Sequence, residues 1–290
     1  MASAIAQGFY DTLTKNGIKM TRSLAVDSNT GAIDLSVQSQ ALTRALASSP
    51  DAVAYFVLDP SASRPQISQA MDAGIPVFAS FGKPEFDVSA YIPLNDDNNG
   101  YVSAKYLAER LPAGAEVAIL GGPATPNVKA LEQGALSAFQ EAGVKIVGDV
   151  EQQRNLDDNA DGGKKVMQGI LQRFPKVQGV FAYNDDSAIG AIAAAKQAGA
   201  DVKFTSRNGT ADAVAAVKSG DLLATCDLQP IQFGQSLGQA VVDQLKGSRK
   251  YSNSEQIAGP DTSKCLITPE NAGSWKPYDQ QLNYRTIPMG

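Results

Sequence analysis

Polar side chains that can form paired hydrogen bonds follow two predicted strands in the second half of the chain. Asn184 and Asp185 come directly after one apolar run, and Arg207 and Asn208 come after the next. Planar amides, carboxylates and guanidinium groups each offer two donor or acceptor atoms in a fixed geometry, so they can distinguish one arrangement of hydroxyl groups from another. These residue types predict recognition of a small polar molecule by hydrogen bonding.

The composition argues against catalysis by these side chains. The chain has no histidine, which excludes a Ser-His-Asp triad, a Cys-His dyad and an imidazole-based metal site. Acidic residues occur as adjacent pairs such as Asp157-Asp158 and Asp185-Asp186. Adjacent carboxylates seldom flank one bond from two sides, as glycoside cleavage requires. We therefore predict a protein that is not an enzyme and that uses neither a cofactor nor a metal ion.

Alternating strands and helices must position the polar residues. Apolar runs typical of buried strands occur at 53–58, 76–80, 116–120, 145–150, 177–182, 202–205 and 222–226. Helix-forming segments separate most of these runs, and an extended run at 18–26 lies between helices predicted at 3–16 and 33–47. This alternation predicts parallel sheets wrapped by helices, and such sheets bind ligands beyond the carboxyl ends of their strands.

Two segments also carry a family resemblance. FAYNDDSAIGAIAAAKQAG, followed by NGTADAVAAVKSGDLLATCDLQP, resembles the sugar-binding group of type I periplasmic binding proteins, which share their fold with the effector domains of LacI-type repressors. The likeness includes DPSASRPQISQAMDAGIPVFA and extends over nearly the whole chain. It implies two similar doubly wound α/β domains, joined by a three-crossing hinge, that close around one small polar ligand.

The resemblance also implies domain boundaries. The first domain would hold residues 1–95 plus 231–264, and the second would hold residues 96–230 plus 265–290. The second half opens on a predicted strand, whereas the first half opens directly on a helix. Because the first strand of a doubly wound sheet is central, we expect that the family's first N-terminal strand is missing here and that the start of the sequence is truncated or misassigned.

Candidate ligand contacts follow from the family's motifs. Asn184 falls where the family's Asn-Asp motif places a sugar-contacting asparagine, and the same position is also that of a helix N-cap. Arg207-Asn208-Gly209 replaces the usual Phe-Asp-Gly. A ligand contact is favoured over a plain turn for Asn208. Arg207 is either a surface arginine or a partner for ring oxygens or for an anionic group such as that of a sugar acid.

Five further residues complete the predicted set. Phe81 can stack on a sugar ring or fill the core, and Asp158 falls where the family has another contact residue. Gln229 lies one position after the usual sugar-binding glutamine, and Lys129 lies near the position of the family's usual arginine. Asp185 is either a contact or a carboxylate that caps the helix after it.

The resemblance implies a monomeric periplasmic binding protein of an ABC importer. Such a protein would capture a sugar, polyol or sugar acid and present it to a membrane permease. The alternatives are the effector-binding domain of a LacI-type regulator and a ligand sensor for a receptor. The 25 basic and 30 acidic residues give a net charge of −5, which argues against a nucleic-acid partner. No run approaches 18 apolar residues, so we expect no membrane insertion, and no signal peptide is evident near Met1.

Cys226 and Cys265 are the two cysteines of the chain. They are either two buried, small apolar residues or one disulfide, which would be typical of an oxidising compartment. In the fold that the resemblance implies, they lie on neighbouring strands near the hinge. The sequence leaves both readings open, because it does not supply the distance between the two side chains.

Overall fold

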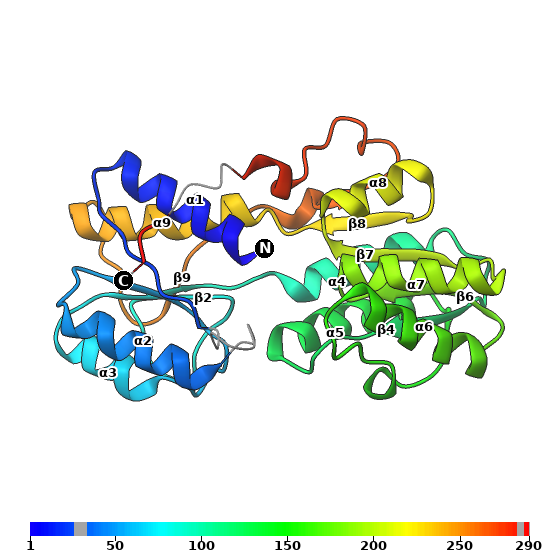
Figure 1. Cartoon of the computed structure of the whole chain (residues 1–290), viewed down its shortest axis with the longest axis horizontal. Coiled ribbons are helices and arrows are strands. Elements are labelled where there is room, and N and C mark those ends of the chain that lie inside the picture. Colours follow the sequence, from blue (N-terminus) through cyan, green and yellow to red (C-terminus); the bar gives the residue numbers. More distant parts are fainter. Residues whose placement is uncertain (26–33, 283–286, 290) are drawn as a thin grey trace. The chain divides into compact units, whose positions relative to one another are not determined.

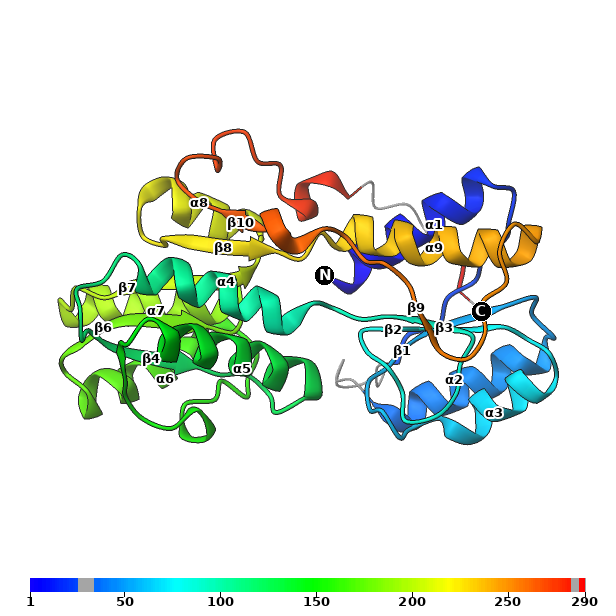
Figure 2. The same ribbon diagram turned by 180° about the vertical axis from the view of Figure 1, so that it is seen from behind.

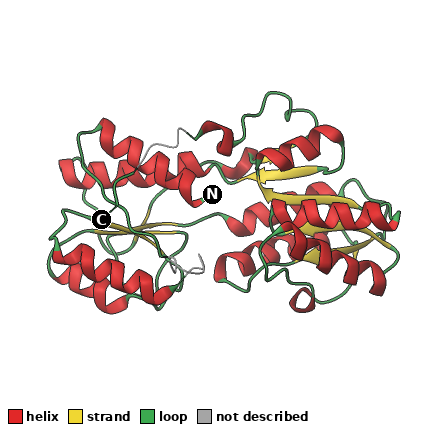
Figure 3. Ribbon diagram, in the orientation of Figure 1, coloured by secondary structure: helices red, strands yellow, loops and turns green. Residues whose placement is uncertain are grey.

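The structure, a computed structural model, describes residues 1–25, 34–282 and 287–289. The chain divides into two compact units, each with a sheet between layers of helices (Figures 1 and 2). Unit 1 contains Met1–Leu94, Pro230–Pro260 and Leu282–Gly290, and unit 2 contains Asn95–Gln229 and Asp261–Gln281. Figure 3 shows the alternation of helices and strands that the apolar runs predict.

The sheet of unit 1 has parallel strands in the order β1-β2-β3-β9. They are β1 (Val53–Phe56), β2 (Val77–Ser80), β3 (Ala90–Ile92) and β9 (Glu255–Gln256). Helices α1 (Ala2–Lys15) and α9 (Pro230–Lys246) pack on one face, and α2 (Leu35–Ala47) and α3 (Arg64–Asp72) pack on the other. Side chains of a strand alternate between the two faces of the sheet. Successive residues of β2 therefore pack into the apolar cores on opposite faces of the sheet.

The predicted extended run at 18–26 does not become a strand over its described residues. Arg22 forms an isolated bridge with Met289, and its backbone N–H donates to Pro288 O at 2.8 Å. Within the described chain β1 pairs only with β2, so it lies at an edge of the sheet. A strand needs a neighbouring strand along its length to satisfy its backbone groups, and one bridge does not supply this.

The sheet of unit 2 has the order β10-β8-β7-β6-β4-β5, and only β10 runs antiparallel to its neighbour. The strands are β4 (Glu116–Leu120), β5 (Lys145–Ile146), β6 (Val177–Ala182), β7 (Lys203–Asn208), β8 (Ala224–Asp227) and β10 (Leu266–Ile267). Strand β7 is longer than predicted, so Arg207 and Asn208 are its last two residues and do not lie in a turn after it. Strand β5 is shorter than the predicted run at 145–150.

Paired helices cover the sheet of unit 2. They are α4 (Asp96–Ala108), α5 (Pro126–Glu141), α6 (Ala160–Arg173), α7 (Asp185–Ala198) and α8 (Ala211–Ser219). Helix α4 packs against α5, and α6 packs against α7. The backbones of α4 and α5 approach closely because the contact is made by glycine on both sides. A Cβ atom on Gly100 would lie 1.9 Å from Leu131 O, and one on Gly134 would lie 1.9 Å from Asp97 O.

Short 3-10 helices occur at η1 (Val150–Gln152), η2 (Thr262–Lys264) and η3 (Tyr278–Gln281).

The division of the chain into two units differs from the expected one near the end of the chain. The third passage between units lies at Pro260–Asp261, earlier than expected, and a fourth follows η3. Four passages replace the predicted three because the end of the tail pairs with Arg22 of unit 1.

Candidate functional site

The carboxyl ends of four neighbouring parallel strands meet along one edge of the unit 2 sheet. In spatial order these strands are β8, β7, β6 and β4, and they end at Asp227, Asn208, Ala182 and Leu120. Because β6 is followed directly by Asn184, this order brings Asn184 and Asn208 to the same edge. We call it the carboxyl edge of unit 2.

Asn184 uses both ends of its amide within unit 2. Its Oδ1 accepts a hydrogen bond from Ser187 N at 2.9 Å, which caps α7, and its Nδ2 donates to Asp158 Oδ1 at 2.8 Å. The side chain is buried, and the segment that carries Asp158 reaches the carboxyl edge through this contact. Sequence reasoning selected both residues, and the structure brings them together.

Asp185 points into the interior of unit 2. One carboxylate oxygen accepts from Ser206 Oγ at 2.6 Å and Thr225 Oγ1 at 2.7 Å, and the other accepts from Thr210 N at 2.8 Å and Thr210 Oγ1 at 3.0 Å. Burial raises the pKa of Asp185 to about 6, although these hydrogen bonds oppose the rise. Both oxygens are therefore used to join β7, β8 and the start of α8, and we leave Asp185 out of the proposed ligand contacts.

Arg207 forms an ion pair inside unit 2. Its Nη1 donates to Asp96 Oδ1 at 3.1 Å, and the two side chains are 4% and 3% exposed. The reading of Arg207 as a surface arginine is therefore wrong. Burial raises the pKa of Asp96, and the charge of Arg207 opposes that rise. The Nε atom of Arg207 is buried without a partner.

Four predicted ligand residues share a strained backbone. Eight described non-glycine residues have a positive φ, and they include Phe81 (72°), Asp158 (50°), Asn208 (135°) and Gln229 (49°). Such conformations cost free energy and cluster at binding sites, where the surrounding structure holds a side chain in a required direction. Asn208 Oδ1 is in addition buried without a partner, so it can accept a hydrogen bond from a molecule outside the chain.

Asp227 is a carboxylate at this edge that sequence reasoning did not select. It accepts hydrogen bonds from Gln229 N at 2.8 Å and Trp275 Nε1 at 3.1 Å, and burial raises its pKa to about 6. The neighbouring Cys226 forms a disulfide with Cys265, next to β10. The side chain of Gln229 donates to Asp261 O at 2.8 Å, so its amide nitrogen is already used.

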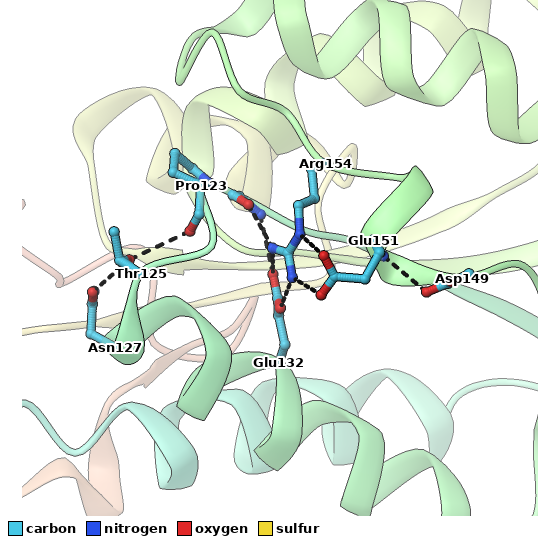
Figure 4. A network of polar contacts seen from close by, with 8 residues as sticks. Pro123, Thr125, Asn127, Glu132, Asp149, Glu151 and Arg154 are labelled. Atoms are coloured by element: carbon cyan, nitrogen blue, oxygen red, sulfur yellow. Dashed lines mark hydrogen bonds and ion pairs between the residues drawn. The ribbon is translucent and has the colours of Figure 1, made fainter.

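Figure 4 shows a polar cluster at the end of β4 that the sequence did not reveal. Arg154 donates to both oxygens of Glu132, at 2.8 and 3.0 Å, and to both oxygens of Glu151, at 2.7 and 3.0 Å. Arg154 also donates to Gly122 O at 2.6 Å, and Gly122 N donates to Glu132 Oε1 at 3.2 Å. The cluster therefore holds the backbone of Gly122 through both its carbonyl oxygen and its N–H group.

Two predicted residues take no part in these contacts. Lys129 is exposed on α5. Phe81 belongs to unit 1, where its ring lies 4.8 Å from that of Phe56 and 5.8 Å from that of Phe233, measured between centroids. A hollow in unit 2, lined by Glu116, Lys145 and other residues, lies at the amino ends of β4 and β5 and contains none of the predicted residues.

The described residues contain no group of three or more acidic or cysteine side chains arranged to hold a metal ion. In the same part of the chain, no helix is both long enough and apolar enough to cross a membrane.

Comparison with known proteins adds independent information. The model of the periplasmic binding protein domain family matches residues 2–249. The ribose import binding protein of Bacillus subtilis (strain 168) is 29% identical over 251 residues, which cover 85% of this chain and 78% of that protein. The ribose import binding protein of Salmonella typhimurium is 37% identical over 165 residues, 56% of this chain and 54% of the relative, so the match spans about half of that protein.

A solved structure shows the same fold. The crystal structure described as a periplasmic ribose ABC transporter from Conexibacter woesei matches with a TM-score of 0.82 and 24% sequence identity, covering 96% of this chain and 91% of that one. The prediction of an α/β fold of the type I periplasmic binding protein kind is confirmed.

Proposed function

This chain belongs to the periplasmic binding protein domain family, and we propose that it is the sugar-binding component of an ABC importer. The family is one of binding proteins and not of enzymes. The relatives named above are ribose import binding proteins, and they supply the ligand class for this proposal. The protein captures its sugar outside the cytoplasm and delivers it to a membrane permease.

The unpartnered amide oxygen of Asn208 is the observation that carries the proposal. Asn208 stands in a strained conformation at the end of β7, and its Oδ1 is buried without a partner. A hydroxyl group of a ligand is the donor that this oxygen lacks. Asp158, Asn184 and Gln229 lie along the same edge. Each amide has two N–H donors and two acceptor lone pairs, so the contacts described above leave part of their capacity for hydroxyl groups of a ligand. Phe81 stays a prediction for a ring contact made by unit 1.

The charges at the carboxyl edge favour a neutral sugar over a sugar acid. Both guanidinium groups described above are already paired, Arg207 with Asp96 and Arg154 with two glutamates. Asp158 and Asp227 add negative charge at the same edge. Since both of these guanidinium groups already hold carboxylates, neither is available to offset the repulsion that an anionic ligand would meet from Asp158 and Asp227, and repulsion in a partly buried site weakens binding.

The disulfide supports a location outside the cytoplasm. Disulfides persist in oxidising compartments, such as the bacterial periplasm, and are rare in the cytosol of most organisms. The Cys226–Cys265 bond joins two segments of unit 2. The bond thus supports our proposal that the protein acts in the periplasm or an equivalent extracytoplasmic space.

A thermal unfolding screen of the full chain tests the proposal. We expect one or a few neutral pentoses, hexoses or polyols to raise the unfolding midpoint in proportion to log concentration. The free energy of unfolding rises by about 2.7 kcal/mol when the ligand concentration is one hundred times its Kd. D-ribose is the first probe, and L-ribose is the matched control because it has the same general solvent effect. If sugar acids stabilise the protein and neutral sugars do not, the assignment of a neutral ligand is wrong. If no member of either class acts, the proposed function is wrong.

A further inference from the structure

Tyr183 lies between β6 and Asn184, and its hydroxyl reaches the carboxyl edge of unit 2. The residue is 4% exposed. Its hydroxyl donates a hydrogen bond to Asp158 Oδ1, and Asn184 Nδ2 donates to the same oxygen at 2.8 Å. Two donors from neighbouring residues therefore fix one oxygen of the Asp158 carboxylate.

The other oxygen of Asp158 is differently placed. Within the part of the chain that the structure describes, no hydrogen bond or ion pair holds Oδ2. The residue is exposed, and its φ of 50° is one of the strained angles described above. A carboxylate held at one oxygen and open at the other is a preorganised acceptor for a hydroxyl donor.

The ring of Tyr183 packs against Gly122. A Cβ atom on Gly122 would lie only 2.3 Å from Tyr183 Cε2. Gly122 is in turn held by Arg154, which donates to Gly122 O at 2.6 Å, and by Glu132, which accepts from Gly122 N at 3.2 Å. The ion-pair cluster at the end of β4 thus supports the ring whose hydroxyl orients Asp158.

The phenol of Tyr183 is the donor in its hydrogen bond to Asp158 at neutral pH. Burial raises the pKa of Tyr183 far above its ordinary value, and the hydrogen bond to Asp158 raises it further. The hydroxyl therefore keeps its proton at neutral pH. Asp158 can act only as the acceptor in this pair when it is ionised.

We propose that Tyr183 is a positioning residue of the sugar site, which acts by turning Asp158 Oδ2 toward a hydroxyl group of the ligand. The inference rests on the proposed function, because it assigns a hydroxyl-bearing ligand to this edge. Tyr183 is not among the residues that the sequence analysis selects.

A cycle of Tyr183→Phe, Asp158→Gly and the double variant tests the inference, with D-ribose as the first probe. Glycine removes the carboxylate and tolerates the positive φ. We expect Tyr183→Phe to weaken binding about tenfold in the native background and to have little effect once Asp158 is glycine. Tyr101→Phe is the matched control, because Tyr101 donates to Glu141 at the far end of α5. The inference would be overturned if Tyr183→Phe weakened binding equally in the native and the Asp158→Gly backgrounds. It would also be overturned if Tyr183→Phe weakened binding no more than Tyr101→Phe does.

Unfolding of the unliganded variants separates this inference from the proposed function. We expect Tyr183→Phe to lower the unfolding midpoint by about 2–4 °C in the native background and by less than half as much beside Asp158→Gly. Additive shifts would show that the pair does not form, and they would overturn the inference whether or not a sugar binds. If the shifts are non-additive and no sugar binds the native protein, the proposed function fails while the contact between Tyr183 and Asp158 stands.

Discussion

Replacing Asn208 by glycine should make unit 2 more stable and its ligand binding weaker. The φ angle of Asn208 is 135°, a conformation that side chains with a Cβ atom adopt only under strain. Such strain costs about 1–3 kcal/mol. Glycine relieves it but loses about 0.5–1 kcal/mol through the greater freedom of the unfolded chain. The net gain is about 1 kcal/mol, which raises the unfolding midpoint of a unit of this size by about 2–4 °C.

The same change removes the acceptor that the proposed function requires. Asn208 Oδ1 is buried without a hydrogen-bond partner among the described residues, so its loss breaks no hydrogen bond to them that would offset the gain in stability. A ligand hydroxyl that meets glycine loses one hydrogen bond, which is worth about 1–2 kcal/mol, or roughly tenfold in Kd.

The assay measures both quantities on Asn208→Gly and on a matched control. Asn253→Gly is suitable, because Asn253 also has a positive φ, 59°, and lies just before β9, at the amino ends of the unit 1 strands. Scanning calorimetry gives the unfolding midpoint, and titration calorimetry with the sugar found in the screen gives Kd. We expect both variants to be stabilised and only Asn208→Gly to bind more weakly. If Asn208→Gly binds the sugar as tightly as the native protein, the assignment of Asn208 as a ligand contact is refuted.

Three further predictions concern the buried groups of unit 2. Arg207→Met should lower the free energy of unfolding by about 3–5 kcal/mol in denaturant unfolding, because it leaves Asp96 buried without its cation. Adding Asp96→Asn should restore part of that free energy, and a double variant no more stable than Arg207→Met would contradict this reading. Removing the disulfide by Cys226→Ser and Cys265→Ser should cost about 4 kcal/mol for a bridge across 39 residues, and reductant should then no longer shift the midpoint of that variant. Burial raises the pKa of Asp227 to about 6, so the folded state keeps a proton that the unfolded chain loses near pH 4. The resulting contribution to the free energy of unfolding, on the order of 3 kcal/mol, is complete below pH 4 and disappears as the pH rises through about 6. A pH series of unfolding midpoints in which Asp227→Asn is as steep as the native protein would contradict the last prediction.

The sequence predicts the strands, helices and fold class of this chain well, because apolar runs and glycine stops are local signals. The resemblance to a known family is confirmed over most of the chain. The sequence predicts the run at 18–26 only as an extended segment. Its described residues, 18–25, form one isolated bridge, between Arg22 and Met289, and such pairing depends on a neighbour that no local pattern can show. The edge at which Asn184 and Asn208 meet follows from the order of parallel strands, and so it was predictable.

The directions of individual side chains were less predictable. Asn184 and Asp185 are adjacent polar residues, yet their side chains point in different directions. Asn184 caps α7 at the carboxyl edge, whereas Asp185 turns into the core, where it joins β7 and β8. Arg207 finds its partner Asp96 at a separation of 111 residues, and no spacing rule connects them. Tyr183 was hidden because an aromatic residue after a buried strand reads as part of the core.

Trp275 gives this protein a built-in optical probe. It is the only tryptophan of the chain, and its indole N–H donates to Asp227 at the end of β8. Indole emission responds to the charge and polarity of its surroundings, so excitation of this single fluorophore reports on one known carboxylate without any attached dye. Spectral titrations with acid or with sugar can therefore be assigned to the end of β8 directly.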